Sequence, residues 1–433
     1  MKAVIMAGGK GTRIREVAAD IPKPMIRVKG KPVLEYQLLN LKENGIRDII
    51  LVVGYLSDSI KAYFGDGSQL GLNIEYINED EPLGTAGALF FLRGKIKEDF
   101  LLLMGDLITG VDFNRFMDFH IRGGKTATLF VHPNSHPYDS DIIVADKDGV
   151  VKEVLSKNGV RSSYYRNRVN AGIYAFSEKI LELIPEKKKT DLDKELIRPL
   201  IEKGQVDAYS SGEYVKDMGT PDRYEAVISD IENGIISARN LNNKQKCIFL
   251  DRDGTINELS GFVRRPEDLR VMEGVPEAIR RINSSEYLCI VVTNQPVIAR
   301  GECSFETMDE INAKLETVLG EKGAYIDDLF LCPHHPDKGF EGEIPELKTD
   351  CECRKPKPGM LLKAAKKYNI DLSGSYMIGD MTQDILCGKN AGASTILVKT
   401  GKGGEDKKYD VIPDRVCRDL SEAVDIILKQ ELK

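Results

Sequence analysis

Short runs of consecutive apolar residues, each bounded by polar or glycine residues, recur along the chain. Ala3–Ala7 and Phe100–Met104 lie in the first half, and Cys247–Leu250 and Leu288–Val292 lie in the second. Such runs are typical of strands that are buried on both faces, as in parallel sheets. The stretch 220–236 places apolar residues at helical spacing instead, which predicts an amphipathic helix. Together the two patterns predict an α/β protein.

A polar, asparagine-rich stretch from 239 to 245 interrupts the pattern and has no apolar period. Such a stretch is typical of a linker, so we predict one domain over residues 1–238 and a second over 246–433. At 433 residues the chain is long enough for each domain to bury its own core.

Composition narrows the function classes. Apolar residues make up 42% and charged residues 30%, as in ordinary soluble globular proteins. The net charge of −7 argues against a nucleic-acid partner but allows local basic pockets for phosphates. We find no signal peptide and no apolar run near the ~18 residues that cross a bilayer, so we expect a cytoplasmic protein without a membrane partner. The eight cysteines are then expected to be thiols or metal ligands rather than disulfides. The sequence leaves the oligomeric state open, a homo-oligomer included.

The first apolar run leads directly into a glycine-rich loop, Gly8-Gly9-Lys10-Gly11-Thr12-Arg13. Glycines there let backbone N–H groups approach a phosphate, and Arg13 adds a permanently charged fork. Downstream, Pro22-Lys23-Pro24 mounts a lysine between two prolines, although a solvated loop lysine is the ordinary alternative. The spacing matches neither the P-loop nor the dinucleotide-binding fingerprint.

Gly8-Gly9-x-Gly11-Thr12-Arg13 followed by Pro22-Lys23-Pro24 resembles the signature of sugar-1-phosphate nucleotidyltransferases, and the resemblance extends to about residue 238. It implies a Rossmann-like, glycosyltransferase-A-like domain. Six further positions agree with the family's base, sugar and metal contacts. They are Gly84 and Thr85 in the loop 81–87, Asn170 and Gly172 in the segment 169–174, Asp106 after an apolar run, and Asp217 in Asp-Met-Gly-Thr-Pro.

The resemblance also implies a reaction. A phosphate oxygen of the sugar 1-phosphate attacks the α-phosphorus of a nucleoside triphosphate, and pyrophosphate leaves. Because both reactants are anions, catalysis is mainly positioning and charge neutralisation. We assign Arg13 to the leaving phosphates, Lys23 to the α-phosphate region, and Mg²⁺ to Asp106 and Asp217. Ser156-Lys157 departs from the family's Glu-Lys, so a sugar contact is expected to change while the phosphate-binding Lys157 remains.

In the second half, the apolar run 247–250 ends in Asp251-Arg252-Asp253-Gly254. Ligands of open α/β sheets bind at the carboxyl ends of strands, and Gly254 allows a sharp turn there. Two neighbouring carboxylates repel each other unless a cation compensates, and Mg²⁺ prefers oxygen ligands. An exposed acidic turn is the ordinary alternative.

Matching pieces follow in order: Thr293 at the end of another run, Lys355 in a polar loop, and Asp380 after a third run, with Asp384 one helical turn later. This order resembles haloacid-dehalogenase-type phosphatases over roughly residues 246–430, which implies a three-layer α/β/α domain. By analogy Asp251 is the nucleophile that forms an aspartyl-phosphate. Asp253 protonates the leaving alcohol and then activates water. Thr293 and Lys355 bind the phosphoryl group, and Asp251, the carbonyl of Asp253 and Asp380 hold Mg²⁺.

Two close pairs of soft ligands, Cys332-Pro333-His334-His335 and Cys351-Glu352-Cys353, predict a tetrahedral, structural Zn²⁺ site. The residues alone leave the choice between His334 and His335 open. The resembling phosphatases use Cys-x-His, which favours Cys332, His334, Cys351 and Cys353.

The stretch from Cys332 to Met360 resembles heptose 1,7-bisphosphate phosphatases, with histidinol-phosphate phosphatases as relatives. In that branch Arg354 helps to recognise a second phosphate, and Asn294 and Arg300 fall at ligand-contact positions. Three departures lie at the substrate rim, so the substrate is less determined than the reaction type. They are Leu259–Phe262, Pro296 and Met381.

The two resemblances together suggest a bifunctional enzyme of nucleotide-heptose synthesis for surface polysaccharide. The phosphatase would remove the 7-phosphate of a heptose 1,7-bisphosphate, and the transferase would couple the 1-phosphate to GMP from GTP. The base preference rests on similarity of the loop 81–87 to the branch that makes GDP-heptose. The alternatives are a mannose or glucose 1-phosphate nucleotidyltransferase fused to a histidinol-phosphate-like phosphatase, and a non-catalytic sugar-nucleotide sensor. The intact acids of both domains argue against the sensor.

Overall fold

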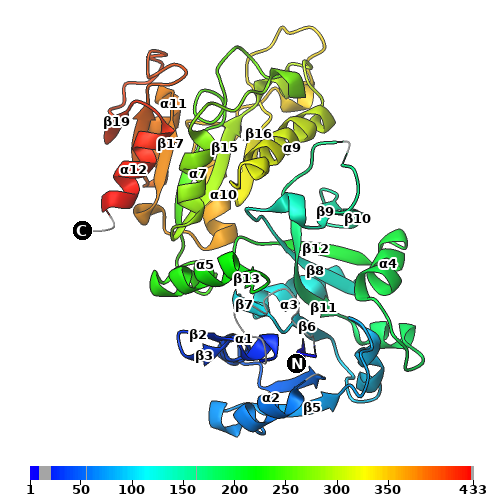
Figure 1. Cartoon of the computed structure of the whole chain (residues 1–433). Coiled ribbons are helices and arrows are strands. Elements are labelled where there is room, and N and C mark those ends of the chain that lie inside the picture. The colour runs from blue at the N-terminus through cyan, green and yellow to red at the C-terminus, as the bar shows by residue number, and fades with distance from the viewer. Residues whose placement is uncertain (9–20, 55, 162, 431–433) are drawn as a thin grey trace. The chain divides into compact units, whose positions relative to one another are not determined.

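The computed structural model describes residues 1–8, 21–54, 56–161 and 163–430. The chain forms two compact units (Figure 1). The first comprises Met1–His132, Ile143–Leu155 and Val169–Asn240, and the second Pro133–Ile142, Ser156–Arg168 and Leu241–Lys433. Both units are mixed α/β, which confirms the predicted fold class.

The described strands of the first unit include a nine-stranded sheet with the order β10-β9-β11-β6-β1-β4-β5, and β8 joins β11 to β12. Strand β1 is parallel to β4 and β6, whereas β11 is antiparallel to β6 and β8. The strands are β1 (Lys2–Met6), β4 (Asp48–Val53), β5 (Asn73–Asn78), β6 (Phe100–Met104), β8 (Ala127–His132), β9 (Ile142–Ala145), β10 (Val151–Leu155), β11 (Val169–Phe176) and β12 (Val206–Ser210).

Apolar runs form these central strands because both faces of the sheet are covered. In β1, Val4 packs into one core cluster while Ala3 and Ile5 pack into another. Leu102 of β6 and its neighbours Leu101 and Leu103 divide between the same two clusters. Since strand side chains alternate between faces, a strand covered on both sides must be apolar at every position.

Helices and two small sheets complete the first unit. The helices are α1 (Val33–Glu43), α2 (Ser57–Phe64), α3 (Phe113–Gly123), α4 (Arg198–Glu202), α5 (Pro221–Glu232) and α6 (Ile235–Ala238). The small sheets pair β2 (Arg27–Val28) with β3 (Lys31–Pro32), and β7 (Leu107–Gly110) with β13 (Tyr214–Asp217). The helix predicted over 220–236 is present but breaks between α5 and α6, where Gly234 has a φ of 69°.

The second unit contains a parallel six-stranded sheet among its described residues, with the order β16-β15-β14-β17-β18-β19. The strands are β14 (Lys246–Leu250), β15 (Tyr287–Asn294), β16 (Asp328–Cys332), β17 (Tyr376–Gly379), β18 (Ser394–Val398) and β19 (Arg415–Cys417). The helices are α7 (Val275–Asn283), α8 (Pro296–Ala299), α9 (Phe305–Glu321), α10 (Gly359–Tyr368), α11 (Thr382–Ala391) and α12 (Leu420–Gln430). One core cluster joins Ile248 and Leu250 to α7, α9 and α12, and another joins Cys247 and Phe249 to α10 and α11. Helices therefore cover both faces of this sheet.

Two short segments from the predicted first domain group with the second unit, Pro133–Ile142 and Ser156–Arg168. They do so because residues around Arg168 contact Glu316 of α9, which is buried. Arg168 Nη1 lies 3.1 Å from Glu316 Oε2, and the Asn167 N–H donates to the same oxygen over 2.8 Å. The other division between the units falls between Asn240 and Leu241, inside the predicted linker. The predicted domain boundaries themselves stay a prediction.

Candidate functional site

The first candidate centre lies at the carboxyl ends of three neighbouring strands of the second unit. Strand β14 lies between β15 and β17, and all three are parallel, so the residues after them meet at one edge. Asp251 follows β14, Thr293 lies near the end of β15, and Asp380 follows β17. All three side chains are buried. The structure thus brings together residues separated by up to 129 positions, from Asp251 to Asp380.

Lys355 lies at the middle of this cluster and is also buried. Its Nζ lies 2.6 Å from Asp251 Oδ1 and 2.7 Å from Asp384 Oδ1, and it donates to the Val292 carbonyl over 2.9 Å. Burial alone would lower the pKa of Lys355, but the two carboxylates outweigh it and raise this pKa, so the ammonium stays charged. Asn294 holds the lysine's backbone: its Oδ1 accepts from the Lys355 N–H over 3.1 Å.

Carboxylate oxygens of Asp251, Asp380 and Asp384 all lie within 4.8 Å of one another. Burial raises the pKa of Asp251 well above its usual range, and it raises the pKa of Asp380 to about 7. Oδ1 of Asp380 is buried and has no hydrogen-bond partner. A hard divalent cation fits this set of oxygens, because it would neutralise the repulsion and use the unpaired atom.

Gly254 is required at the turn beside this cluster. Its φ is 89°, and a Cβ on it would lie 2.4 Å from Asp380 Oδ2. Any side chain here would therefore both strain the backbone and displace a carboxylate of the cluster.

Asp253 lies outside the three-carboxylate group. Gln295 Nε2 donates to its Oδ2 over 2.7 Å, and Asn257 Nδ2 donates to its Oδ1 over 3.0 Å. The adjacent Arg252 contacts both carboxylate oxygens. Gln295 also donates to Thr293 Oγ1 over 2.8 Å, which ties Asp253 to the predicted phosphoryl-binding hydroxyl.

Two arginines lie at the rim of the same unit. The Arg300 guanidinium lies 4.8 Å from the ring centre of Phe262 and 4.4 Å from that of Phe340. Arg354 donates to the His334 carbonyl over 3.0 Å. Burial lowers the pKa of Arg354, and the nearby charge of Arg300 lowers it further, so an anion would relieve the repulsion between them. Phe262, which belongs to the departure Leu259–Phe262, therefore packs against Arg300, a residue predicted to contact the ligand.

Of the other two departures, only the first has a local explanation. Pro296 is the first residue of α8, where a backbone N–H has no partner within the helix. Met381 precedes α11, and its backbone N–H donates to Asp384 Oδ2 over 3.0 Å. Any residue except proline would make this contact, so nothing in the structure explains the methionine.

Cys332, His334, Cys351 and Cys353 form a second group that could hold a metal ion. Cys353 Sγ lies 3.2 Å from the sulfurs of both other cysteines and 3.4 Å from His334 Nδ1. The thiol of Cys332 lowers the pKa of Cys353 to about 5 by hydrogen bonding, which favours a thiolate there. His335 points elsewhere, with its Nε2 3.1 Å from Arg300 Nη2. The set of one imidazole and three thiols suits a closed, tetrahedral zinc site.

The first unit carries the other candidate centre. Asp106 lies between β6 and β7, Asp217 ends β13, and the Met218 N–H donates to the Asp106 carbonyl over 3.0 Å. Lys23 forms an ion pair with Asp106. Arg223 Nη1 lies 2.8 and 2.7 Å from the two carboxylate oxygens of Asp217. Burial would raise the pKa of Asp217, but Arg223 and then Lys23 outweigh it and lower this pKa.

Close packing leaves no room for a Cβ at two glycines of the loops in this unit. A Cβ on Gly8 would lie 2.6 Å from Glu79 Oε2, and one on Gly84 would lie 2.5 Å from the Thr190 carbonyl. Thr85 Oγ1 accepts from the Leu192 N–H over 2.7 Å, so this hydroxyl anchors its own loop. Gly9, Gly11, Thr12 and Arg13 lie outside the described residues.

Asn170 and Gly172 form an irregularity in β11. The Gly172 N–H donates to Asn170 Oδ1, and Asn170 Nδ2 donates to the Tyr174 hydroxyl, each over 3.0 Å. Lys157 belongs to the second unit, where its Nζ lies 3.9 Å from Asp139 Oδ1. The role predicted for Lys157 stays a prediction.

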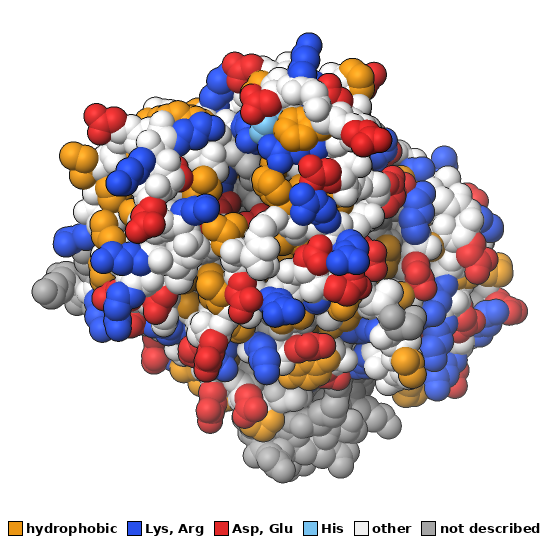
Figure 2. All heavy atoms as spheres, turned by 90° about the horizontal axis from the view of Figure 1, so that it is seen from above, with side chains coloured by type: hydrophobic (Ala, Val, Ile, Leu, Met, Phe, Trp, Pro, Cys, Tyr) orange, Lys and Arg blue, Asp and Glu red, His pale blue; other side chains and the backbone are white. Residues whose placement is uncertain are grey.

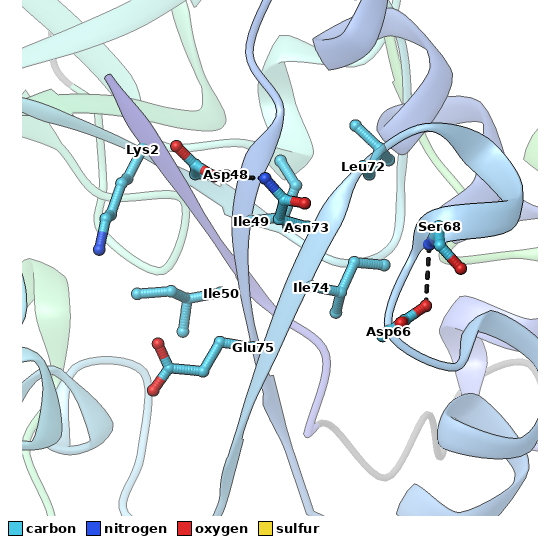
Figure 3. A pocket seen from close by; sticks show the side chains of 10 residues that line it. All are labelled: Lys2, Asp48, Ile49, Ile50, Asp66, Ser68, Leu72, Asn73, Ile74 and Glu75. Carbon is cyan, nitrogen blue, oxygen red and sulfur yellow. Dashed lines mark hydrogen bonds between the residues drawn. The ribbon is translucent and has the colours of Figure 1, made fainter.

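Two further features lie on the surface. The groove in Figure 3 is lined by residues that begin strands of the first unit, including Lys2, Asp48 and Asn73. It therefore lies at the amino-terminal edge of the sheet, opposite the edge that leads into Gly8. On the face in Figure 2, basic and acidic side chains are interspersed.

Comparison with known proteins assigns the first half. The nucleotidyl transferase family matches residues 2–234. The chain belongs to this family. A mannose-1-phosphate guanylyltransferase from Mycobacterium tuberculosis is 33% identical over 236 residues, which are 54% of this chain and 65% of that protein. The chain thus spans just under two thirds of this relative. The crystal structure of HddC from Yersinia pseudotuberculosis is similar at 28% identity, covering 53% of this chain and 99% of that one, with a TM-score of 0.47.

This nucleotidyl transferase carries a second domain. The HAD-hydrolase-like family matches residues 352–423. A D-glycero-beta-D-manno-heptose-1,7-bisphosphate 7-phosphatase from Pasteurella multocida is 43% identical over 160 residues, which are 36% of this chain and 84% of that protein. The chain therefore combines a nucleotidyl transferase domain with a HAD-like phosphatase domain. None of the described helices combines the length and apolar character that crossing a membrane requires.

Sequence reasoning missed several residues of these centres. The sequence placed Asp384 one helical turn after Asp380 but assigned it no role. This spacing is the feature that could have identified it as a member of the carboxylate group. The contact of Arg223 Nη1 with both oxygens of Asp217 lies across the turn from β13 to α5. The contacts of Arg252 and Gln295 with Asp253 had no signal in a single sequence, because they depend on side-chain direction.

Proposed function

We propose that the chain is a bifunctional enzyme of nucleotide-heptose synthesis. Its phosphatase domain converts D-glycero-D-manno-heptose 1,7-bisphosphate to the 1-phosphate. Its transferase domain then transfers GMP from GTP to this 1-phosphate, giving GDP-heptose and pyrophosphate. The observation that carries the proposal is the buried group of Asp251, Asp380 and Asp384 around Lys355, in a domain 43% identical to a heptose-bisphosphate phosphatase.

The phosphatase step follows from the positions of these groups. Lys355 holds Asp251 Oδ1, which leaves its other oxygen as the nucleophile toward phosphorus. The ammonium and the Thr293 hydroxyl then bind the transferring phosphoryl oxygens. Asp251 and Asp380 would hold Mg²⁺ with the carbonyl of Asp253, and a bound Mg²⁺ supplies positive charge for the phosphoryl oxygens. Asp253 donates a proton to the leaving oxygen and later takes one from water.

The rim supports a substrate with a second phosphate. Arg300 and Arg354 are close enough to repel each other, and the rings of Phe262 and Phe340 hold the Arg300 guanidinium between them. A planar arginine fork suits a phosphate group better than a lone hydroxyl. A monophosphate would place no second phosphate beside these two guanidinium groups.

The transferase step relies on the ion pairs of the first unit. Asp106 and Asp217 would hold Mg²⁺, which supplies charge neutralisation for the triphosphate. In the structure Lys23 pairs with Asp106 and Arg223 pairs with Asp217. Both cations are therefore close to the place where a phosphate would bind beside these carboxylates. Lys23 binds the α-phosphate region and Arg13 the leaving phosphates. The guanine preference is supported by the 33% identical guanylyltransferase.

The cysteine and histidine group is proposed to hold a structural Zn²⁺ in the phosphatase domain. Four protein ligands close the coordination sphere, so the ion would stabilise the segment 332–353 rather than react. Metal analysis of the purified protein should find one zinc per chain, and Cys353→Ser should abolish it.

The direct test is incubation of the purified protein with the heptose 1,7-bisphosphate, GTP and Mg²⁺. We expect free phosphate, followed by pyrophosphate and GDP-heptose. Matched reactions contain mannose 1-phosphate with GTP, and histidinol phosphate alone. Faster turnover of mannose 1-phosphate, which the guanylyltransferase relative makes the leading alternative, would overturn the heptose assignment. Release of phosphate from histidinol phosphate in preference would overturn the assignment of the phosphatase domain.

A further inference from the structure

Arg252 makes a set of contacts that the proposed function does not use. Its side chain is 0% exposed. Nε donates to Asp253 Oδ1 over 3.1 Å, and Nη2 donates to Asp253 Oδ2 over 3.0 Å. Two parallel N–H···O contacts of this kind fix the plane of a carboxylate as well as its position.

The far side of the same guanidinium is anchored in α9. Arg252 Nη1 donates to Asn312 Oδ1 over 3.1 Å and lies 3.4 Å from Met308 Sδ. Asn312 and Met308 are both buried. The fork therefore has one side held by the helix and the other side directed at Asp253.

Each oxygen of the Asp253 carboxylate accepts two N–H groups. Oδ1 accepts from Arg252 and from Asn257 over 3.0 Å, and Oδ2 accepts from Arg252 and from Gln295 over 2.7 Å. Asn257 and Gln295 are buried, whereas the Asp253 side chain is still 21% exposed. The donors thus surround a carboxylate that a substrate can still reach.

A role in fold stability alone does not account for this arrangement. Burying an arginine is costly unless its charge is paired. The contacts of Arg252 with Asn312 and Met308 join the turn after β14 to α9, which is a structural role. The ion pair with Asp253 has no such role, because the two residues are neighbours in the chain. What the contacts determine is the orientation of the Asp253 side chain.

We propose that Arg252 is a positioning residue for Asp253 in phosphoryl transfer, an inference that rests on the proposed phosphatase function. In the first step an Asp251 oxygen bonds to phosphorus, the bond from phosphorus to the sugar oxygen breaks, and that oxygen takes the proton of the Asp253 carboxyl. In the second step Asp253 takes a proton from water. The water oxygen bonds to phosphorus as the bond to Asp251 breaks, so phosphate leaves and both aspartates are restored. Arg252 holds the Asp253 carboxyl in one plane through both transfers.

This role predicts a dependence on the leaving group. A sugar hydroxyl leaves as a poor anion and needs the proton of Asp253, whereas p-nitrophenolate leaves without one. Loss of positioning should therefore slow the sugar phosphate much more than p-nitrophenyl phosphate. A general loss of folding would slow both substrates equally.

The experiment compares Arg252→Met, Arg252→Lys, Asp253→Asn and the double variant Arg252→Met/Asp253→Asn in the full chain. Met308→Leu is the control, since it keeps the volume next to Arg252 and leaves the fork on Asp253 intact. We expect Arg252→Met to lower kcat for the heptose bisphosphate by roughly 100-fold and kcat for p-nitrophenyl phosphate by only about threefold. Asp253→Asn should show the same selectivity, and the double variant should lose little more than Asp253→Asn. Met308→Leu should match the wild type on both substrates.

Equal losses on the two substrates, or additive losses in the double variant, would overturn the positioning role. If Arg252→Met does not fold, Arg252→Lys decides the matter, since it keeps the charge but not the two parallel contacts. Arg252→Lys should still lower kcat more for the sugar phosphate than for p-nitrophenyl phosphate. An equal fall in kcat for both substrates would overturn the inference. A wild-type protein that hydrolyses neither substrate would instead overturn the proposed phosphatase function.

Discussion

The two centres gather acidic side chains at strand ends but neutralise them differently. In the second unit, three buried carboxylates lie together, one buried lysine pairs with two of them, and Oδ1 of the third, Asp380, has no hydrogen-bond partner. In the first unit, Asp106 and Asp217 each pair with a cation of their own, Lys23 and Arg223. Burial and the repulsion between the carboxylates of the second unit raise the pKa of Asp251 and of Asp380, so bound protons or a bound cation must balance the negative charge there. Among the described residues of the first unit, Asp106 and Asp217 are each balanced by their own cation, so we expect both ion pairs to rearrange if a triphosphate and Mg²⁺ bind there.

The largest expected effect is the loss of one activity while the other is kept. Asp251→Asn removes the nucleophile, so phosphate release should fall by on the order of 10⁴-fold or more, because no aspartyl-phosphate can form. Formation of GDP-heptose from the 1-phosphate should be unchanged. The measurement is phosphate release and nucleotide transfer by the same preparation. Full phosphatase turnover by this variant would refute the nucleophile assignment.

The reciprocal change acts on the first unit. Asp217→Asn removes a proposed Mg²⁺ ligand and the partner of Arg223, and should lower transferase kcat by roughly 10²–10³-fold. Phosphatase activity should remain, as pyrophosphate and phosphate assays on one sample would show. Asp230→Asn is a matched control, because this carboxylate pairs with the Tyr214 hydroxyl over 2.7 Å and with Lys216, outside the proposed metal ligands. Equal losses from both substitutions would contradict a specific role for Asp217.

The lysines of the two centres should differ in their effect on stability. Lys355→Met leaves buried carboxylates unpaired and should destabilise the second unit by about 3–5 kcal/mol. Lys23→Met breaks a partly exposed pair and should change the stability of the first unit by only about 1 kcal/mol or less. Hydrogen exchange of the β14 and β1 amides measures the two units separately. Similar losses in both would show that the Lys355 pairs are no more desolvated than the Lys23 pair.

The smallest expected effect is the pH dependence of stability, which should have opposite signs in the two units. Burial raises the pKa of Asp380 to about 7 from 3.8, so in metal-free protein its contribution to stability is present below pH 4 and is lost as the pH rises through 7. Asp217 has a lowered pKa, so its contribution is present at neutral pH and is lost as the pH falls below about 4. Hydrogen exchange of both units in EDTA, between pH 4 and 8, measures this. Mg²⁺ should stabilise the second unit more at pH 8 than at pH 5, and an equal gain at both would contradict the assignment.

Local patterns determined much of what the sequence revealed. The apolar runs predicted β1, β6, β14 and β15, because a strand covered on both faces is apolar at every position. Asp251 was visible because it directly follows such a run, and Asp380 because only Gly379 separates it from another. Gly254 was visible because a turn after a strand end needs a residue without a Cβ.

The tertiary structure decided which side chains meet. Lys355 reaches Asp251 across 104 positions, and Arg223 turns back onto Asp217 through the start of α5. The choice of His334 over His335 depends on which of two adjacent side chains faces the cysteines. The grouping of Ser156–Arg168 with the second unit depends on the buried Glu316. Periodicity records only which face of its own element a residue occupies, whereas these contacts join elements whose spacing is set by the packing of the whole sheet.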